Sequence, residues 1–102
     1  MKYKAIVKFF TYEEGGRVRP PLSGFRPQLR IGNESTSTTV KLADCDVEEA
    51  VMEFGKEHVV YLELMFEDMY REKLNAILKS GNKDVELYEG NKLVGKGTMI
   101  DY

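Results

Sequence analysis

Short runs in which apolar and polar residues alternate are the feature that most constrains the fold of this chain. In residues 3–12, Ala5, Val7 and Phe9 share one parity, and Lys4 and Lys8 fall between them. Such alternation puts every second side chain on the same face of a strand, so that one face is buried and the other is solvated. The sequence predicts further strands at residues 25–31, Thr38–Leu42, Val59–Phe66, Asp84–Glu89 and Leu93–Ile100.

Glycine and proline separate these runs. Gly15-Gly16 permits a turn with positive φ, and Pro20-Pro21 excludes helix and removes two ladder donors. Pro27 indicates that the second strand begins there, lies at an edge or contains a bulge. Residues 32–39 are polar and are predicted as a loop that leads into the short strand Thr38–Leu42. The last two runs are predicted to form a hairpin across Gly90-Asn91-Lys92.

The apolar period changes in residues 67–80. Tyr70, Leu74, Ile77 and Leu78 stand at i, i+4, i+7 and i+8, which is the stripe of an amphipathic helix, and Gly81 is a plausible stop. The apolar stripe is expected to pack on the sheet, where the helix would cap an open barrel end or cover an apolar surface. Five or six strands and one helix predict a mainly β domain, either a small barrel or a sandwich.

A weaker helical signal precedes the fourth run. Asp46 is a suitable N-cap, Glu49 follows it at the third position, and the apolar residues from Val47 to Phe54 have helical spacing. The alternative, a short turn or loop within residues 43–57, is the one that we favour.

The composition limits the class of protein. The 102 residues are 42% hydrophobic and 31% charged, which predicts a single compact domain over residues 1–102. One cysteine excludes an intrachain disulfide and favours a cytoplasmic location. A single Cys and a single His cannot make a zinc site of four Cys/His ligands, and no apolar run approaches the roughly 20 residues that span a membrane. We therefore expect no metal, no cofactor and no membrane contact.

Charge is distributed unevenly along the chain, although the net charge is only −2. Residues 1–30 hold seven Lys/Arg and two acids, whereas residues 31–72 hold three Lys/Arg and eleven acids. Such asymmetry can place a basic face on an acidic protein. The alternative is that the two blocks lie side by side in the fold and neutralise each other.

Two stretches rich in glycine, proline and basic residues form a distinctive pair. The first is Glu14-Gly15-Gly16-Arg17, then Pro20, then Gly24-Phe25-Arg26-Pro27-Gln28-Leu29. The second is Glu89-Gly90-Asn91-Lys92-Leu93-Val94-Gly95-Lys96-Gly97. Together they resemble the third, C-terminal domain of translation elongation factor Tu, and the resemblance covers about half of the chain. The family has a short irregular crossing where this chain has the helical pattern of residues 67–80.

The resemblance implies a six-stranded antiparallel β-barrel with one inserted helix near residues 67–80. The family's GTPase domain and second barrel are absent from this sequence, and so is the Gly-x4-Gly-Lys-Ser/Thr loop that cradles a nucleotide. GTPase activity is therefore not carried over, and no nucleotide is expected. In the family, the third domain contacts the T stem of aminoacyl-tRNA and the nucleotide-exchange factor.

The residues that match positions near the family's T-stem contact are Arg17, Glu89 and Gly90. Asn91 replaces the family's second turn glycine, and the turn is expected to form because asparagine tolerates the left-handed region. Lys92 replaces the family's following arginine and is a further candidate, since it keeps the charge. Arg17, Arg19, Arg26 and Arg30 form a candidate phosphate-facing set, since phosphate contacts fix a nucleic-acid backbone. For Arg26 the alternative is structural, with its guanidinium bound to carbonyls or a carboxylate within the barrel.

The leading prediction is therefore a non-catalytic binding module associated with translation, tRNA or other RNA. The alternative is a protein-interaction or oligomerisation module that kept the barrel but not RNA binding, and it is favoured if the acidic block lies near Arg17 and Glu89. A small enzyme is the weakest alternative and needs a pocket with perturbed acids. Cys45, between two aspartates, and His58, without an obvious partner, are predicted to have no functional role.

Overall fold

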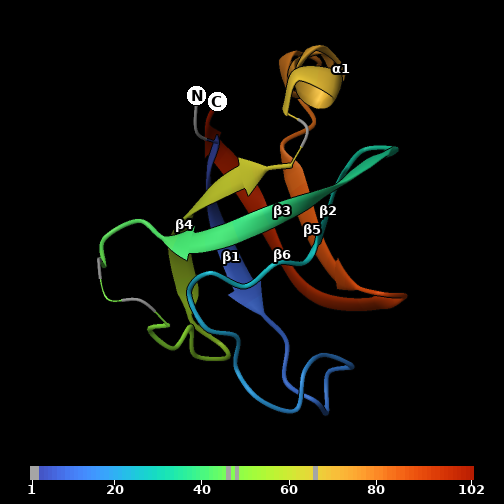
Figure 1. Cartoon of the computed structure of the whole chain (residues 1–102). Coiled ribbons are helices and arrows are strands. Elements are labelled where there is room, and N and C mark those ends of the chain that lie inside the picture. Colours follow the sequence, from blue (N-terminus) through green and yellow to red (C-terminus); the bar gives the residue numbers. More distant parts are fainter. Residues whose placement is uncertain (1–2, 46, 48, 66) are drawn as a thin grey trace.

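Six strands form a closed antiparallel barrel in the computed structural model, which describes residues 3–45, 47, 49–65 and 67–102 (Figure 1). The elements are β1 (Tyr3–Phe9), β2 (Gln28–Ile31), β3 (Glu34–Leu42), β4 (Glu57–Leu64), α1 (Glu67–Lys79), β5 (Asp84–Glu89) and β6 (Lys92–Asp101). The order around the barrel is β1, β4, β3, β2, β5, β6, and β6 pairs again with β1. The predicted mainly β fold with one helix is confirmed, as a barrel and not a sandwich.

The alternating pattern decides which side chains fill the barrel. In β1 the four buried apolar side chains are Tyr3, Ala5, Val7 and Phe9. In β4, Val60 and Leu62 are buried and Leu64 packs against the core, as predicted, while Phe66 lies outside the described residues. Closing the sheet on itself gives every strand two neighbours and leaves no open edge.

Two tight hairpins of this barrel use the same dipeptide, Gly-Asn. Ile31 pairs with Glu34 across Gly32-Asn33, and Glu89 pairs with Lys92 across Gly90-Asn91. Both Gly32 and Gly90 have a φ of 60°, as the first position of a type II′ turn requires. The hairpin prediction is thus confirmed and the turn forms with Asn91, although the positive φ lies at Gly90 and not at Asn91.

The third strand is longer than predicted. Residues 32–39 were expected to be a loop because they are polar, but β3 begins at Glu34. Thr36 and Thr38 alternate with solvent-facing residues and are buried. Their hydroxyl groups donate hydrogen bonds to the carbonyl oxygens of Met65 (3.4 Å) and Glu63 (3.0 Å). A β-branched residue whose hydroxyl has an acceptor can therefore occupy an interior position of this strand.

The helix predicted from Val47 to Phe54 is wrong in the described part of that segment, where turns and extended backbone replace it. Asp46, its predicted cap, and Glu48 lie outside the described residues. The Met52 amide donates to the Pro21 carbonyl (2.8 Å), and Met52 is fully buried. A long-range backbone pairing therefore prevails over a local helical spacing, and the loop alternative is the observed one.

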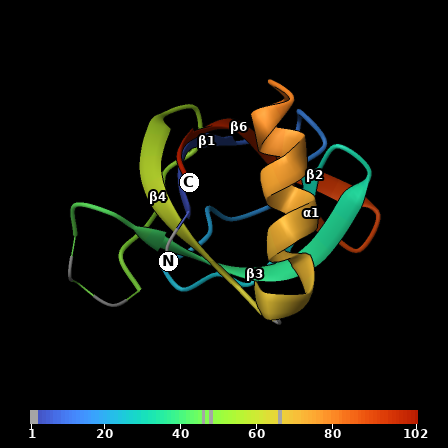
Figure 2. The same cartoon turned by 90° about the horizontal axis from the view of Figure 1, so that it is seen from above.

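Helix α1 lies across one end of the barrel, on the side of β2 and β3 (Figures 1 and 2). Its predicted stripe faces the core, with Leu74 and Leu78 buried and Tyr70 and Ile77 packed against the same cluster. The Tyr3 hydroxyl donates to Asn75 Oδ1 (3.2 Å), and burial raises the pKa of this tyrosine. The predicted helix and its packing on the barrel are confirmed. Within the described chain, α1 lacks the length and apolar character needed to cross a membrane.

Candidate binding site

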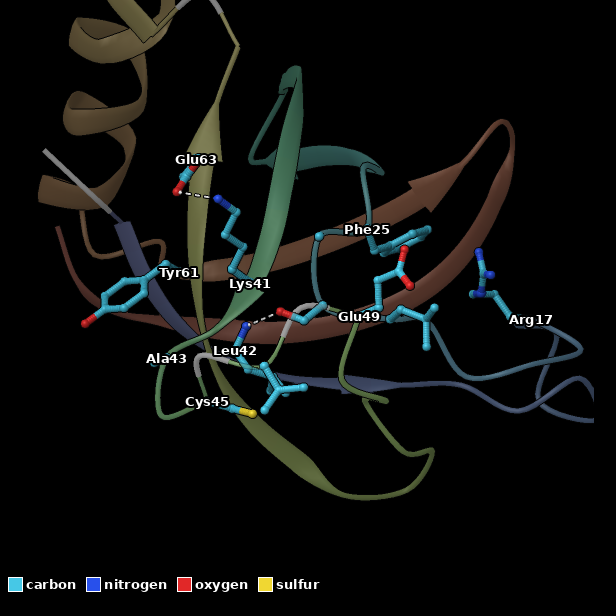
Figure 3. Close-up of a pocket in the computed structure, with 13 residues that line it drawn as sticks. Arg17, Phe25, Lys41, Leu42, Ala43, Cys45, Glu49, Tyr61 and Glu63 are labelled. Atoms are coloured by element: carbon cyan, nitrogen blue, oxygen red, sulfur yellow. Dashed lines mark hydrogen bonds and ion pairs between the residues drawn. The ribbon is translucent and has the colours of Figure 1, made fainter.

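An open groove of about 740 Å³ lies between the outer sides of β3 and β4, the long loop 10–27 that precedes β2, and the loop 43–56 that joins β3 to β4. Figure 3 shows Lys41, Tyr61 and Glu63 along one side of it, and Arg17, Phe25 and Glu49 toward the other. The remaining lining residues come from the 22–24 and 42–47 segments: Leu22, Ser23, Gly24, Leu42, Ala43, Cys45 and Val47. Three stretches that are distant in sequence therefore build one surface feature.

The 20–25 segment is held in place by backbone bonds on both of its sides. The Gly24 amide donates to the Val40 carbonyl (2.7 Å), and the Val40 amide donates to the Phe25 carbonyl (2.8 Å). Ser23 adds two bonds, because its amide donates to Ala50 (2.8 Å) and its hydroxyl oxygen accepts from the Leu42 amide (3.0 Å). This wall of the groove is thus preformed against β3 and the 50–52 segment.

Two apolar side chains in the groove are exposed. Leu22 is 42% exposed and Val47 is 66% exposed, and both line the groove. Val51, which forms an isolated bridge with Leu22, is exposed as well. Phe25 also lines the groove, and its ring forms a T-shaped contact with the ring of buried Phe9 at a centroid distance of 6.3 Å. The groove therefore combines an apolar lining with charged groups on its rim.

Arg17 is fixed by three contacts at one end of the groove. Its guanidinium forms an ion pair of 2.7 Å with Glu89, its Nε donates to the Arg19 carbonyl (3.0 Å), and it lies 4.7 Å from the centroid of the Phe25 ring. The ion pair and the contact with the Phe25 ring both act on the planar guanidinium, so together they fix the orientation of the Arg17 side chain. Its charge is largely neutralised by the partner carboxylate.

The other charged groups of the groove differ in their partners. Lys41 Nζ lies 3.4 Å from Glu63 Oε1, and Lys4 lies over the Tyr61 ring at 5.9 Å. Glu49 has a φ of 59°, which is unusual for a residue other than glycine. Among the described residues, neither Glu49 nor the neighbouring Asp44 forms an ion pair.

The residues predicted from the resemblance fall into two groups. Arg17, Glu89, Gly90 and Lys92 come together, since Arg17 pairs with Glu89 at the β5–β6 turn that Gly90 and Lys92 complete. The Lys92 ammonium also lies 6.0 Å from the centroid of the Tyr12 ring.

The second group consists of Arg19, Arg26 and Arg30. Arg30 is exposed on β2, with its guanidinium 5.6 Å from the centroid of the Tyr88 ring. Arg26 is exposed as well, so the alternative that its guanidinium is held within the barrel is wrong. Arg19 is exposed on the 10–20 loop and contributes its carbonyl to Arg17.

The single histidine has a hydrogen-bond partner, and the single cysteine lies at the groove. His58 Nε2 lies 2.8 Å from the Glu53 carbonyl oxygen, which is a partner that the sequence did not predict. Cys45 is half-buried and lines the groove. Within the described residues, no three His, Cys, Asp or Glu side chains gather closely enough to hold a metal ion.

Sequence reasoning missed the groove itself. Leu22 follows Pro20-Pro21 and Val47 stands in an acidic segment, so neither falls on an alternating run. The sequence feature that could have indicated the groove was an apolar residue in an otherwise polar loop. Such residues are too common on protein surfaces to identify a site by themselves. No known protein-family model matches the chain.

Proposed function

We propose that this chain is a non-catalytic interaction module that binds a peptide segment of a protein partner in the groove. The observation that carries the proposal is the exposure of Leu22 and Val47 from two loops that line the same concave surface. Apolar side chains gathered on a surface indicate an interaction site, and ligand sites are concave with an apolar lining and a few polar groups.

The charges near Arg17 also favour a protein partner over a phosphate backbone. Glu49 and Glu63 belong to the acidic block of residues 31–72 and share the groove with Arg17, whose own charge is paired with Glu89. A phosphate that approached Arg17 along the groove would meet these carboxylates, and like charges at an interface are costly. The placement of these carboxylates with Arg17 supports the interaction function over RNA binding in the groove.

A peptide-library experiment tests the proposal. Random peptides displayed on phage are selected on the wild-type protein, and the recovered peptides are then measured against Val47→Asp and Val18→Asp. Val18 is 74% exposed and does not line the groove, so it is a matched control. We expect Val47→Asp to weaken binding by about 10-fold or more, since a buried charge without a partner is strongly unfavourable. Val18→Asp should bind like the wild type.

Two results would contradict this proposal. One is a selection that yields no peptide above background on a folded wild-type protein. The other is a set of peptides that bind Val47→Asp and wild type equally, because their site would then lie elsewhere on the barrel.

A second candidate function, RNA binding, is favoured by the outer face of β2 and the adjoining hairpin. Arg26, Arg30 and Lys92 are exposed there. Arg30 and Lys92 each lie over a tyrosine ring. Exposed cations beside aromatic rings can contact both phosphates and bases. The resemblance to the third domain of elongation factor Tu places its T-stem match at the β5–β6 turn, which Lys92 completes.

Binding to fluorescently labelled tRNA and to an unrelated RNA hairpin, at low and physiological salt, tests this second function. A variant with Arg26→Glu and Arg30→Glu is compared with a control that carries Lys73→Glu and Lys79→Glu on α1. RNA binding at the β2 face predicts that the first variant loses affinity and that its salt dependence falls by roughly one unit of slope per lost phosphate contact. Equal losses in both variants would instead indicate a response to net charge alone, and the β2 face would be rejected.

A further inference from the structure

We infer that the groove accepts a basic segment of a partner protein, in which an apolar side chain is flanked by lysine or arginine. This inference rests on the proposed protein-interaction function and adds the chemistry of the partner. It follows from which charges of the groove are already compensated within the fold and which are not.

The two cations that line the groove are compensated. Arg17 is paired with Glu89 at 2.7 Å, and Lys41 is paired with Glu63 at 3.4 Å. Arg17 is also stacked on Phe25 and bonded to the Arg19 carbonyl, which orients its guanidinium. An acidic ligand would therefore have to share either cation with a carboxylate that already contacts it.

The carboxylates of the loop that borders the groove are not compensated. Glu49 lines the groove and Asp44 is exposed beside it, and neither takes part in an ion pair within the described chain. The residual charge of this side of the groove is thus negative, close to the exposed Val47.

A ligand complementary to this surface carries positive charge on either side of an apolar group. The apolar group would cover Leu22 and Val47, and the flanking ammonium or guanidinium groups would lie near Glu49 and Asp44. Complementary charges mainly raise the association rate and select the partner, whereas the buried apolar anchor supplies most of the affinity. The same carboxylates disfavour nucleic acid in this groove, which separates it from the basic face of β2.

The peptides that are selected from the phage library on the wild-type protein are the ligands that test this inference. We expect them to be richer in lysine and arginine than the unselected library. Replacing those residues by glutamine should weaken binding. On the protein side, Glu49→Gln removes one carboxylate, and Glu13→Gln is the control because Glu13 is an exposed acid outside the groove lining. A loss of about 1.4- to 5-fold in affinity is expected for Glu49→Gln, as for a single exposed ion pair. Glu49→Lys should weaken binding further, and higher salt should reduce the difference from wild type.

The outcomes separate this inference from the function on which it rests. Peptides that depend on Val47 but carry no excess of basic residues, or that are indifferent to Glu49→Lys, would leave groove binding intact and overturn the basic-segment inference. Equal effects of Glu49→Gln and Glu13→Gln would also overturn it, since the response would then be to net charge. If the selection yields no groove-dependent peptide, the interaction function and this inference both fail.

Discussion

Replacing Leu78 with alanine is expected to lower the free energy of unfolding by about 2–5 kcal/mol, the usual cost of removing a buried leucine side chain. Leu78 is fully buried where α1 packs on the barrel end, and the truncation would lose apolar contact and leave a cavity. Urea denaturation followed by circular dichroism measures this change.

Met69→Ala on the same helix is the matched control. Met69 is 69% exposed, so its truncation should change stability by less than about 0.5 kcal/mol. Leu74, which is buried one turn before Leu78, should respond like Leu78. If Leu78→Ala costs no more than Met69→Ala, then α1 is not packed on the barrel in solution.

Replacing Gly97 with alanine is expected to destabilise the barrel by about 3 kcal/mol or more, at the upper end of the cost of overpacking. A Cβ at this position would overlap the carbonyl oxygen of Ile6 and would lie 2.8 Å from the Cα of Val7. Because these are backbone atoms of the paired strand β1, relief requires β1 and β6 to move apart. The change is measured by thermal or urea unfolding of the variant.

Substitutions at two neighbouring positions on β6 are expected to destabilise the barrel less than Gly97→Ala does. A Cβ at Gly95 would come closest to Phe9 Cδ1, at 2.9 Å, and a ring can shift more readily than a strand backbone. Gly95→Ala should therefore cost less than Gly97→Ala, and Lys96→Ala, at an exposed position, should cost least. A Gly97→Ala protein as stable as Lys96→Ala would show that the β1–β6 pairing is looser than the observed register.

Arg17 belongs to both candidate functions, which limits its use as a test. It lines the groove, and it also pairs with Glu89 beside the β5–β6 turn. A charge reversal at Arg17 would remove the ion pair, the contact with Phe25 and a groove-lining group together. Variants at Val47 on one side, and at Arg26 and Arg30 on the other, each change one surface and so distinguish the two functions.

Local periodicity predicted most of the secondary structure. The alternation in β1 and β4 and the helical stripe of α1 repeat over enough residues to separate a buried face from a solvated one. Prediction failed where a short segment depends on a distant partner. The buried threonines of β3 need the carbonyls of residues 63 and 65, and residues 51 and 52 pair with residues 21 and 22 instead of forming a helix.

The faces of β1 and β4, the helix and the Gly90-Asn91 turn were predictable from the sequence, because each depends on residues that are close along the chain. Arg17 and Glu89 entered one hypothesis only through resemblance to a known family. Their pairing across 72 positions, the exposure of Arg26, and the groove that Leu22 and Val47 share follow from the tertiary structure alone. Closure of the barrel brings together loops that are distant in sequence. No local sequence pattern determines how far apart these loops lie in space.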